Sequence, residues 1–202
     1  MIRLAIVEDH PAIAEGLSAL LRDEADVTVV GVAPNCVTAD ALIAAQSPDV
    51  VLCDIRLEGP MDGLEILVRH TPGPAFIMLS AYSYPSYYSA AVESGAKGYL
   101  SKMATIAQIL TAVRTVAAGG TAFPDAVRRA ARGALRPPTP RESQILALVA
   151  EGRANAEIAE GLSLRLKTVE SQLRRMFDRY DVTSRTALVR VAQRQGWLEG
   201  DG

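Results

Sequence analysis

The sequence predicts a two-domain protein in which a doubly wound α/β domain, built on a five-stranded parallel sheet, precedes an all-α domain. Three observations lead to this prediction. The length of 202 residues suits two small domains better than one, since a single domain usually has about 100–150 residues. The first half alternates short, apolar, β-branched runs with helix-like stretches. No strand-like run follows Pro140.

Five strand–helix units make up the first half. Parallel strands cannot be joined by tight turns and need crossover connections, so a helix should follow each strand and cover one face of the sheet. The predicted strands span Ile2–Val7, Val27–Val32, Val50–Cys53, Phe76–Leu79 and Gly98–Leu100. The predicted helices span Ala12–Arg22, Thr38–Gln46, Leu64–His70, Tyr87–Ser94 and Ile106–Ala118. In such a sheet the ligand site forms outside the carboxyl ends of the strands.

Glycine and proline residues mark the boundary between the domains. Gly119-Gly120 ends the last helix of the first half, and Pro137-Pro138 cannot continue a helix. We therefore predict a first domain over 1–119, a linker over 120–138 and a second domain over 139–202. Part of the linker, Asp125–Ala134, has the pattern of a short helix with arginines on its surface.

The second domain is predicted to contain a helix-turn-helix. Its first helix opens with Thr139 as N-cap and Glu142 three residues later, the spacing of a capping box. A second helix should span Asn155–Leu162 and a third Lys167–Tyr180, with a tight turn between them. One face of the third helix is apolar and consists of Val169, Leu173, Met176 and Tyr180. The opposite face is polar and consists of Lys167, Ser171, Arg174, Arg175 and Asp178, with Glu170 beside them. From periodicity alone, a small helical bundle with a solvated charged face remains an alternative.

Charge is distributed unevenly. Residues 1–120 hold seven Lys and Arg against thirteen Asp and Glu, whereas residues 165–194 alone hold eight basic and three acidic residues. This asymmetry favours nucleic-acid binding by the second domain. No apolar run is long enough for a membrane span, and the N-terminus lacks the pattern of a signal peptide. Cys36 and Cys53 have no metal-ligand spacing; we expect both to be buried and the chain to be cytoplasmic.

Polar residues follow the predicted strands of the first domain. Glu8 and Asp9 follow the first strand, and Asp54 follows the third. Carboxylates held together need a cation, and an oxygen-only set favours Mg²⁺. Ser80 ends the fourth strand and Lys102 follows the fifth. Each residue alone could simply cap a turn, but together they indicate phosphoryl transfer to a carboxylate. His10, beside the acidic pair, is interpreted as a loop residue rather than a ligand.

The first domain closely resembles the receiver domains of response regulators. The residues that carry the resemblance are Ile6-Val7-Glu8-Asp9-His10, Val51-Leu52-Cys53-Asp54-Ile55, Leu79-Ser80-Ala81 and Gly95-Ala96-Lys97-Gly98-Tyr99-Leu100-Ser101-Lys102. The resemblance implies that Asp54 is the phosphoacceptor and that Glu8, Asp9, Asp54 and the carbonyl of Arg56 bind Mg²⁺. It also implies that Ser80 and Lys102 contact the phosphoryl group and that Tyr99 is the aromatic switch residue. The loop after Asp54 is one residue longer than usual, and Met103 replaces the usual proline.

The second domain, over Thr139–Ala192, resembles the four-helix DNA-binding domain of the LuxR/NarL/FixJ family. The matching stretches are Thr-Pro-Arg-Glu at 139–142, Glu151-Gly152, Asn155-Ala156-Glu157-Ile158-Ala159, Lys167-Thr168-Val169-Glu170 and Ser184-Arg185-Thr186. The resemblance implies that the third helix enters the major groove of double-stranded DNA. Bases would be read by Glu170, Ser171 and Arg174, and phosphates held by Lys167, Thr168 and Arg175. Glu170, Gln172, Ser163 and Arg165 depart from the family's usual residues.

Together these resemblances predict a transcription regulator, not a metabolic enzyme, that a sensor histidine kinase phosphorylates on Asp54 and that forms homodimers when phosphorylated. One alternative is a phosphorylation-independent DNA-binding protein with a vestigial receiver. Another is a Mg²⁺-dependent aspartyl-phosphate phosphatase, which leaves the basic second domain unexplained. The aromatic run of Tyr82, Tyr84, Tyr87 and Tyr88 has two open interpretations, as a dimer or partner surface and as side chains that fill the helix–sheet seam.

Overall fold

The computed structural model describes residues 1–58, 62–81, 84–125, 127 and 135–198 of the chain. The chain forms two compact units: the first comprises residues 1–83 and 87–132, and the second comprises residues 84–86 and 133–202. Among the described residues, no helix is long and apolar enough to cross a membrane.

A five-stranded parallel sheet forms the centre of the first unit, as predicted. Its strands lie in the order β2-β1-β3-β4-β5, the order of a doubly wound sheet. They span β1 (Ile2–Val7), β2 (Val27–Ala33), β3 (Val50–Asp54), β4 (Ala75–Ser80) and β5 (Gly98–Ser101). The central strand β3 is buried along its whole length, which explains its unbroken apolar run.

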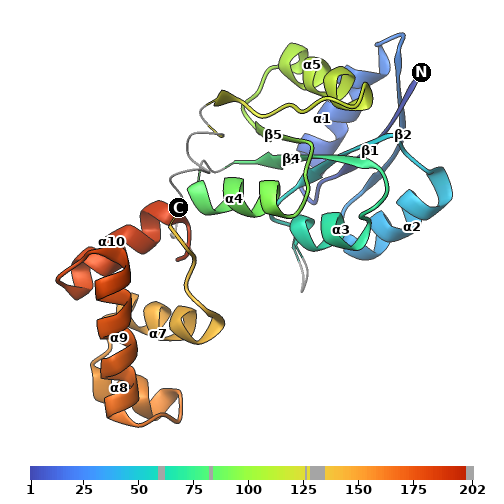
Figure 1. Cartoon of the computed structure of the whole chain (residues 1–202). Helices are drawn as coiled ribbons and strands as arrows, with labels where there is room; N and C mark the ends of the chain where they lie inside the picture. Colours follow the sequence, from blue (N-terminus) through green and yellow to red (C-terminus); the bar gives the residue numbers. More distant parts are fainter. Residues whose placement is uncertain (59–61, 82–83, 126, 128–134, 199–202) are drawn as a thin grey trace. The chain divides into compact units, whose positions relative to one another are not determined.

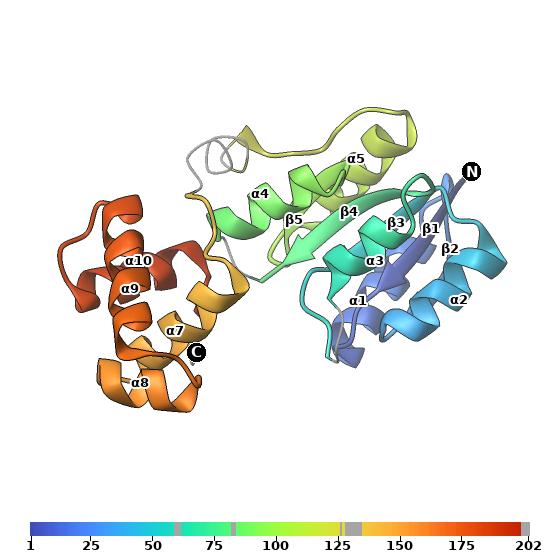
Figure 2. The same ribbon diagram turned by 60° about the horizontal axis from the view of Figure 1, so that its bottom comes forward.

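Helices cover both faces of this sheet (Figures 1 and 2). One face packs against α1 (Pro11–Arg22) and α5 (Ile106–Ala117), and the other against α2 (Cys36–Gln46), α3 (Gly63–Arg69) and α4 (Pro85–Glu93). Successive strand residues alternate between the two cores, because side chains in a strand point to opposite faces. Cys36 and Cys53 are both buried, as predicted.

The chain returns to the sheet after α5. Ala122 forms a parallel β-bridge with Gly98, so the residues beyond α5 lie alongside the outer edge of β5. Val127 is buried in the core shared by α2, α3 and α4. These residues belong to the predicted linker, yet they pack into the first unit. Of the helix predicted over Asp125–Ala134, residues 126 and 128–134 lie outside the described part of the chain.

The second unit contains four helices in its described part: α7 (Pro140–Ala150), α8 (Asn155–Gly161), α9 (Leu166–Tyr180) and α10 (Arg185–Gln195). The predicted capping box is present, since the N–H of Thr139 donates to Glu142 Oε2 (2.9 Å) and the N–H of Glu142 donates to Thr139 Oγ1 (3.3 Å). The predicted apolar face of α9 is confirmed; its buried residues are Val169, Leu173, Met176 and Tyr180.

Two polar contacts hold the C-terminal end of α9 in this unit. The guanidinium of Arg179 donates to both carboxylate oxygens of Glu142, each at 2.9 Å. The hydroxyl of Tyr180 donates to the carbonyl oxygen of Arg136 (3.1 Å). The Glu142 carboxylate therefore joins the start of α7 to the end of α9, and Tyr180 joins α9 to the chain that precedes α7.

Replacing Glu142 by Gln should destabilise the second unit in a pH-dependent way. Burial alone raises the pKa of Glu142, but the hydrogen bonds from Arg179 and Thr139 outweigh it, and the pKa lies below its usual value. A carboxyl whose pKa is lower in the folded state stabilises the fold above its unfolded pKa, and this contribution is lost as the pH falls through the folded pKa. We expect E142Q to lower the free energy of unfolding by about 2 kcal/mol at neutral pH, and the difference to shrink below about pH 4.

Urea unfolding followed by Trp197 fluorescence measures this effect, because Trp197 is the chain's one tryptophan and packs on the core of the second unit. The matched control is E151Q. Glu151 pairs with Arg153 on the surface, and loss of such a pair changes stability by less than about 1 kcal/mol. A loss for E142Q that stays the same from pH 7 to pH 3 would contradict the assigned role of the ion pair.

Candidate phosphoacceptor site and DNA-binding helix

The carboxyl ends of four strands bring the predicted polar residues together. Asp54 ends β3, Ser80 ends β4, Glu8 follows β1 and Lys102 follows β5. Backbone hydrogen bonds fix their register: the N–H of Lys102 donates to the carbonyl of Ser80 (2.8 Å), and the N–H of Glu8 to the carbonyl of Ala33 (3.0 Å). The sheet itself therefore positions these side chains at one edge.

Lys102 lies between the two buried carboxylates. Its Nζ is 2.7 Å from Asp54 Oδ2, 2.9 Å from Glu8 Oε1 and 2.8 Å from Glu8 Oε2. Asp54 is only 3% exposed and Glu8 only 1%. A buried carboxylate is costly unless it is paired, and the lysine supplies the charge that stabilises both.

Burial and Lys102 act on Asp54 in opposite directions. Burial raises the pKa of the Asp54 carboxyl, and the hydrogen bond and charge of Lys102 offset part of that rise. For Lys102 itself burial lowers the pKa, but the hydrogen bonds to Asp54 and Glu8 outweigh burial and raise it. The lysine therefore stays charged, and it favours the anionic, nucleophilic form of Asp54.

Three carboxylates and His10 also form a group whose ligand atoms lie close enough together to hold a cation. One ligand atom each from Glu8, Asp9, His10 and Asp54 lies within 4.8 Å of the others. The buried Glu8 Oε2 accepts no hydrogen bond from the described residues, although Lys102 lies near it. Carboxylate oxygens are the ligands that Mg²⁺ prefers, so Glu8, Asp9 and Asp54 fit that ion, whereas His10 Nδ1 is hydrogen-bonded with Asp9 Oδ1 (2.8 Å). The Arg56 N–H donates to Asp54 Oδ1 (3.2 Å), which brings the backbone of residue 56 against the acceptor.

The loop after Asp54 is held at both ends. The N–H of Glu58 donates to Asp9 Oδ2 (2.7 Å), and the N–H of Gly63 donates to the carbonyl of Ile55 (2.9 Å). Residues 59–61 of this longer loop lie outside the described part. Sequence reasoning gave Gly63 no role, but a Cβ there would lie 1.9 Å from the carbonyl oxygen of Asp54. A glycine is therefore required where α3 begins against the acceptor.

Gly63→Ala should consequently destabilise the first unit by about 1–3 kcal/mol, because the added carbon overpacks the backbone at Asp54. Gly16→Ala is the matched control, since Gly16 lies inside α1 and a Cβ there would have no atom within 4 Å. That substitution should stabilise the helix by about 0.5–1 kcal/mol. Scanning calorimetry of the full chain compares the two; equal melting temperatures would refute the close-approach argument.

Tyr99 lies beneath the site, buried rather than turned to solvent. It is 2% exposed, and its hydroxyl is hydrogen-bonded with Ser80. Burial raises the pKa of Tyr99 well above its usual value, and the bond with Ser80 acts in the opposite direction. The ring packs edge-on against Tyr88 of α4, with centroids 4.6 Å apart at 88°. Sequence reasoning treated Tyr88 only as part of a tyrosine run.

That run is divided in the structure. Tyr88 is buried, and Tyr87 is partly buried against the same core, which agrees with the interpretation that these two fill the helix–sheet seam. Tyr82 lies outside the described residues.

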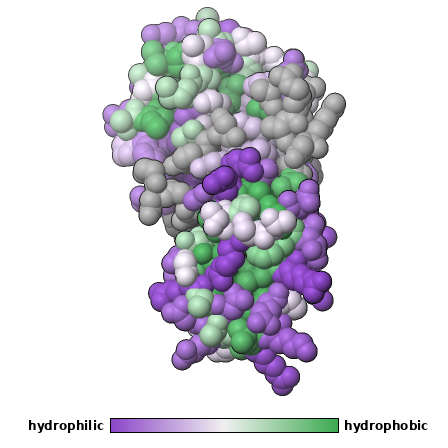
Figure 3. All heavy atoms as spheres, turned by 90° about the vertical axis from the view of Figure 1, so that its left-hand side faces the viewer, coloured by the Kyte–Doolittle hydropathy of each residue, from purple (hydrophilic) through white to green (hydrophobic). Residues whose placement is uncertain are grey.

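The second unit presents the predicted basic surface on α9. Lys167, Glu170, Ser171, Arg174 and Arg175 are exposed, and Thr168 is half-buried. Protruding hydrophilic side chains are visible on this unit in the lower part of Figure 3. The Ser171 hydroxyl donates to the carbonyl of Thr168 (2.9 Å), which leaves its oxygen able to accept a bond from outside.

The turn before α9 contains two residues that depart from the family pattern, Ser163 and Arg165, and each replaces a residue that would favour the local backbone structure. Ser163 has a φ of 53°, in the left-handed region where glycine is favoured. Arg165 occupies the N-cap of α9 and makes no side-chain capping bond. The core under α9 holds the helix in place without either feature.

Comparisons with known proteins assign a family to each of the two domains. Residues 4–114 match the response regulator receiver domain, and residues 138–192 match the luxR family of bacterial regulatory proteins. A receiver followed by such a DNA-binding domain defines a response regulator that controls transcription. The chain belongs to the LuxR-type response regulators.

Named relatives cover nearly the whole chain. The transcriptional regulatory protein UhpA of Escherichia coli is 35% identical, over 94% of this chain and 97% of its own length. LiaR of Bacillus subtilis is 32% identical, over 96% of this chain and 98% of its own length. RcsB of Salmonella enterica serovar Typhimurium, solved bound to a promoter with the phosphomimetic BeF3⁻, is 26% identical with a TM-score of 0.68, over 94% of this chain and 96% of its own.

Proposed function

We propose that this response regulator is switched by Mg²⁺-dependent transfer of a phosphoryl group from a sensor histidine kinase to Asp54. The observation that carries the proposal is the buried Asp54 carboxylate, with Lys102 Nζ at 2.7 Å and the carboxylates of Glu8 and Asp9 beside it. Well-packed apolar residues often stabilise a fold as well as a buried ion pair does, so the buried group of charges favours a functional role for Asp54.

In the proposed reaction an oxygen of Asp54 attacks the phosphorus of a phosphohistidine. The new O–P bond forms as the N–P bond breaks, and the imidazole nitrogen keeps the electron pair. Lys102 and the Ser80 hydroxyl contact the phosphoryl oxygens and stabilise their charge. Glu8, Asp9, Asp54 and the carbonyl of Arg56 would hold Mg²⁺, which neutralises charge on the phosphoryl group when it is bound.

The DNA-binding half of the proposal concerns α9. We assign Glu170, Ser171 and Arg174 to base edges in the major groove, because an arginine can bond guanine through two hydrogen bonds and a carboxylate can accept from cytosine. Lys167, Thr168 and Arg175 hold phosphates. The promoter-bound structure of RcsB supports double-stranded DNA as the partner.

Phosphorylation is proposed to act through dimers. Ser80 and Tyr99 would shift towards the phosphoryl group, and two copies would then bind paired half-sites, since most homodimers are two-fold symmetric. We also propose the limits 1–119, 120–138 and 139–202 for receiver, linker and DNA-binding domain. The receiver catalyses only its own phosphorylation and dephosphorylation, and the chain works in the cytoplasm, where the DNA is.

Selection of bound DNA from a random pool tests the proposal. The full chain is incubated with Mg²⁺, with and without acetyl phosphate as phosphodonor. We expect enriched sequences with two half-sites about one or more helical turns apart, recovered more efficiently with the phosphodonor. Equal recovery without the phosphodonor would favour the alternative of a phosphorylation-independent DNA-binding protein. Turnover of a small phosphoester would favour the alternative of a Mg²⁺-dependent phosphatase.

A further inference from the structure

The segment that follows α5 is bonded to the switch residue through its backbone. We name residues 121–124 the edge segment. The N–H of Tyr99 donates to the carbonyl of Ala122 (3.1 Å), and the N–H of Ala122 donates to the carbonyl of Lys97 (2.8 Å). Gly98, between them, allows this approach, because a Cβ there would lie 3.1 Å from the Ala122 carbonyl oxygen. A movement of the backbone at Tyr99 therefore acts directly on the edge segment.

Side chains make a second connection at the same place. Tyr88, Tyr99 and Val127 are buried in one apolar cluster, and Phe123 packs against it from the edge segment. The cluster thus contains the switch tyrosine, its partner on α4 and the first residues that lead towards the DNA-binding domain. Because Phe123 packs against the cluster that contains Tyr99, we expect a shift of Tyr99 to alter the packing beneath Phe123.

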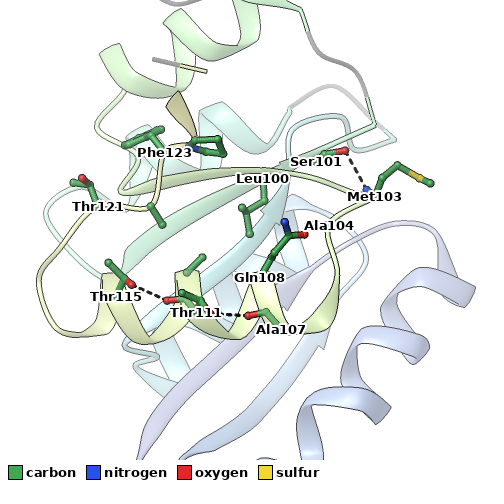
Figure 4. Close-up of a pocket in the computed structure, with 13 residues that line it drawn as sticks. Leu100, Ser101, Met103, Ala104, Ala107, Gln108, Thr111, Thr115, Thr121 and Phe123 are labelled. Carbon is green, nitrogen blue, oxygen red and sulfur yellow. Dashed lines mark hydrogen bonds between the residues drawn. The ribbon is translucent and has the colours of Figure 1, made fainter. Parts of the chain in front are cut away.

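The other side of the edge segment borders an open groove. The groove, of about 640 Å³, lies between α5 and the edge segment, and among its lining residues are Leu100, Met103, Thr111, Thr115 and Phe123 (Figure 4). None of its described lining residues is charged. The hydroxyls of Thr111 and Thr115 donate to the carbonyls of Ala107 and Thr111 inside α5. The edge segment is consequently packed on the side of β5 and has room on the side of α5.

We propose that the edge segment transmits the state of Asp54 to the DNA-binding domain, with Phe123 as a positioning residue that couples it to Tyr99. This inference rests on the proposed phosphorylation of Asp54. When Tyr99 shifts, the bridge between Gly98 and Ala122 loosens and the edge segment moves towards the groove. Because the linker starts from this segment, the movement changes the path by which the chain leaves the receiver.

Amide hydrogen exchange in the full chain tests the proposal. NMR follows the amides of Tyr99 and Ala122, which form the bridge, with Mg²⁺ and with or without acetyl phosphate, and the label on Asp54 is measured in the same sample. We expect both amides to exchange about tenfold faster on phosphorylation, because the bridge loosens. Label on Asp54 with unchanged exchange overturns this inference alone, whereas absence of label overturns the proposed function and this inference with it.

Variants separate coupling from folding. Phe123→Ala should still accept phosphate on Asp54, but its DNA affinity should differ less than about twofold with and without phosphodonor. Met103→Ala is the matched control, since Met103 lines the same groove, is 87% exposed and lies outside the cluster; it should keep the wild-type response. If Phe123→Ala fails to fold, Ala122→Pro, which removes the donor of the bond to Lys97, takes its place. A wild-type response in the folded variant overturns the proposal.

Discussion

Asn in place of Asp54 should abolish the incorporation of acid-labile phosphate by this response regulator. The amide of Asn is a poor nucleophile, so the variant lacks the carboxylate oxygen that we propose attacks the phosphorus. With a radiolabelled phosphodonor and Mg²⁺, we expect label on the wild type and none above background on D54N. The variant should also lose any increase in DNA affinity on addition of phosphodonor.

Asp49→Asn is the matched control for this experiment. Asp49 directly precedes β3, at the end opposite Asp54, where its carboxylate accepts the N–H of Arg3 (2.8 Å), a bond that an amide oxygen can also accept. D49N should incorporate label as the wild type does. Label on D54N, or absence of label from the wild type, would contradict the assignment of Asp54 as phosphoacceptor.

The second large effect concerns DNA recognition by α9. Arg174→Ala should weaken binding to the selected site by about 1–3 kcal/mol, or roughly 5- to 150-fold, and relax the preference at one base pair. Arg174 is exposed and lies outside the buried face of α9, so the substitution should leave the helix folded. Fluorescence anisotropy with the selected site and single-base variants measures both effects.

Two further substitutions distinguish base-specific contacts from sequence-independent electrostatic attraction to DNA. Arg175→Ala should weaken all sequences by a similar factor and reduce the slope of log affinity against log salt by about 1. Arg190→Ala removes the same charge from the exposed surface of α10, and we expect binding within about twofold of the wild type. If R174A and R190A weaken binding equally and without change in base preference, Arg174 is not a reader.

Much of the fold could be predicted because it depends on local patterns. The five apolar runs predict the strands, and the Thr139–Glu142 pair predicts the start of α7, since capping needs only neighbouring residues. The polar residues of the site could be predicted for a related reason. Parallel strands end at one edge of the sheet, so the order of the strands alone brings Asp54, Ser80 and Lys102 together.

The unpredicted features depend on contacts between distant residues. Nothing in the tyrosine run indicates which ring meets Tyr99, because that depends on the rotation of α4 on the sheet. The pairing of Ala122 with Gly98 was missed because one bridge leaves no alternating pattern in the sequence. The bond of Lys102 to Glu8 as well as Asp54 required the side-chain geometry.

The hydrogen bond between the Tyr180 hydroxyl and the Arg136 carbonyl affects the choice of the first residue for a stable fragment of the DNA-binding domain. Tyr180 is buried, and a buried hydroxyl that loses its partner costs about 1–3 kcal/mol. A fragment cut immediately before the first helix would lack the residue that accepts this bond. We therefore expect a fragment that starts before Arg136 to be more stable than one that starts at Thr139.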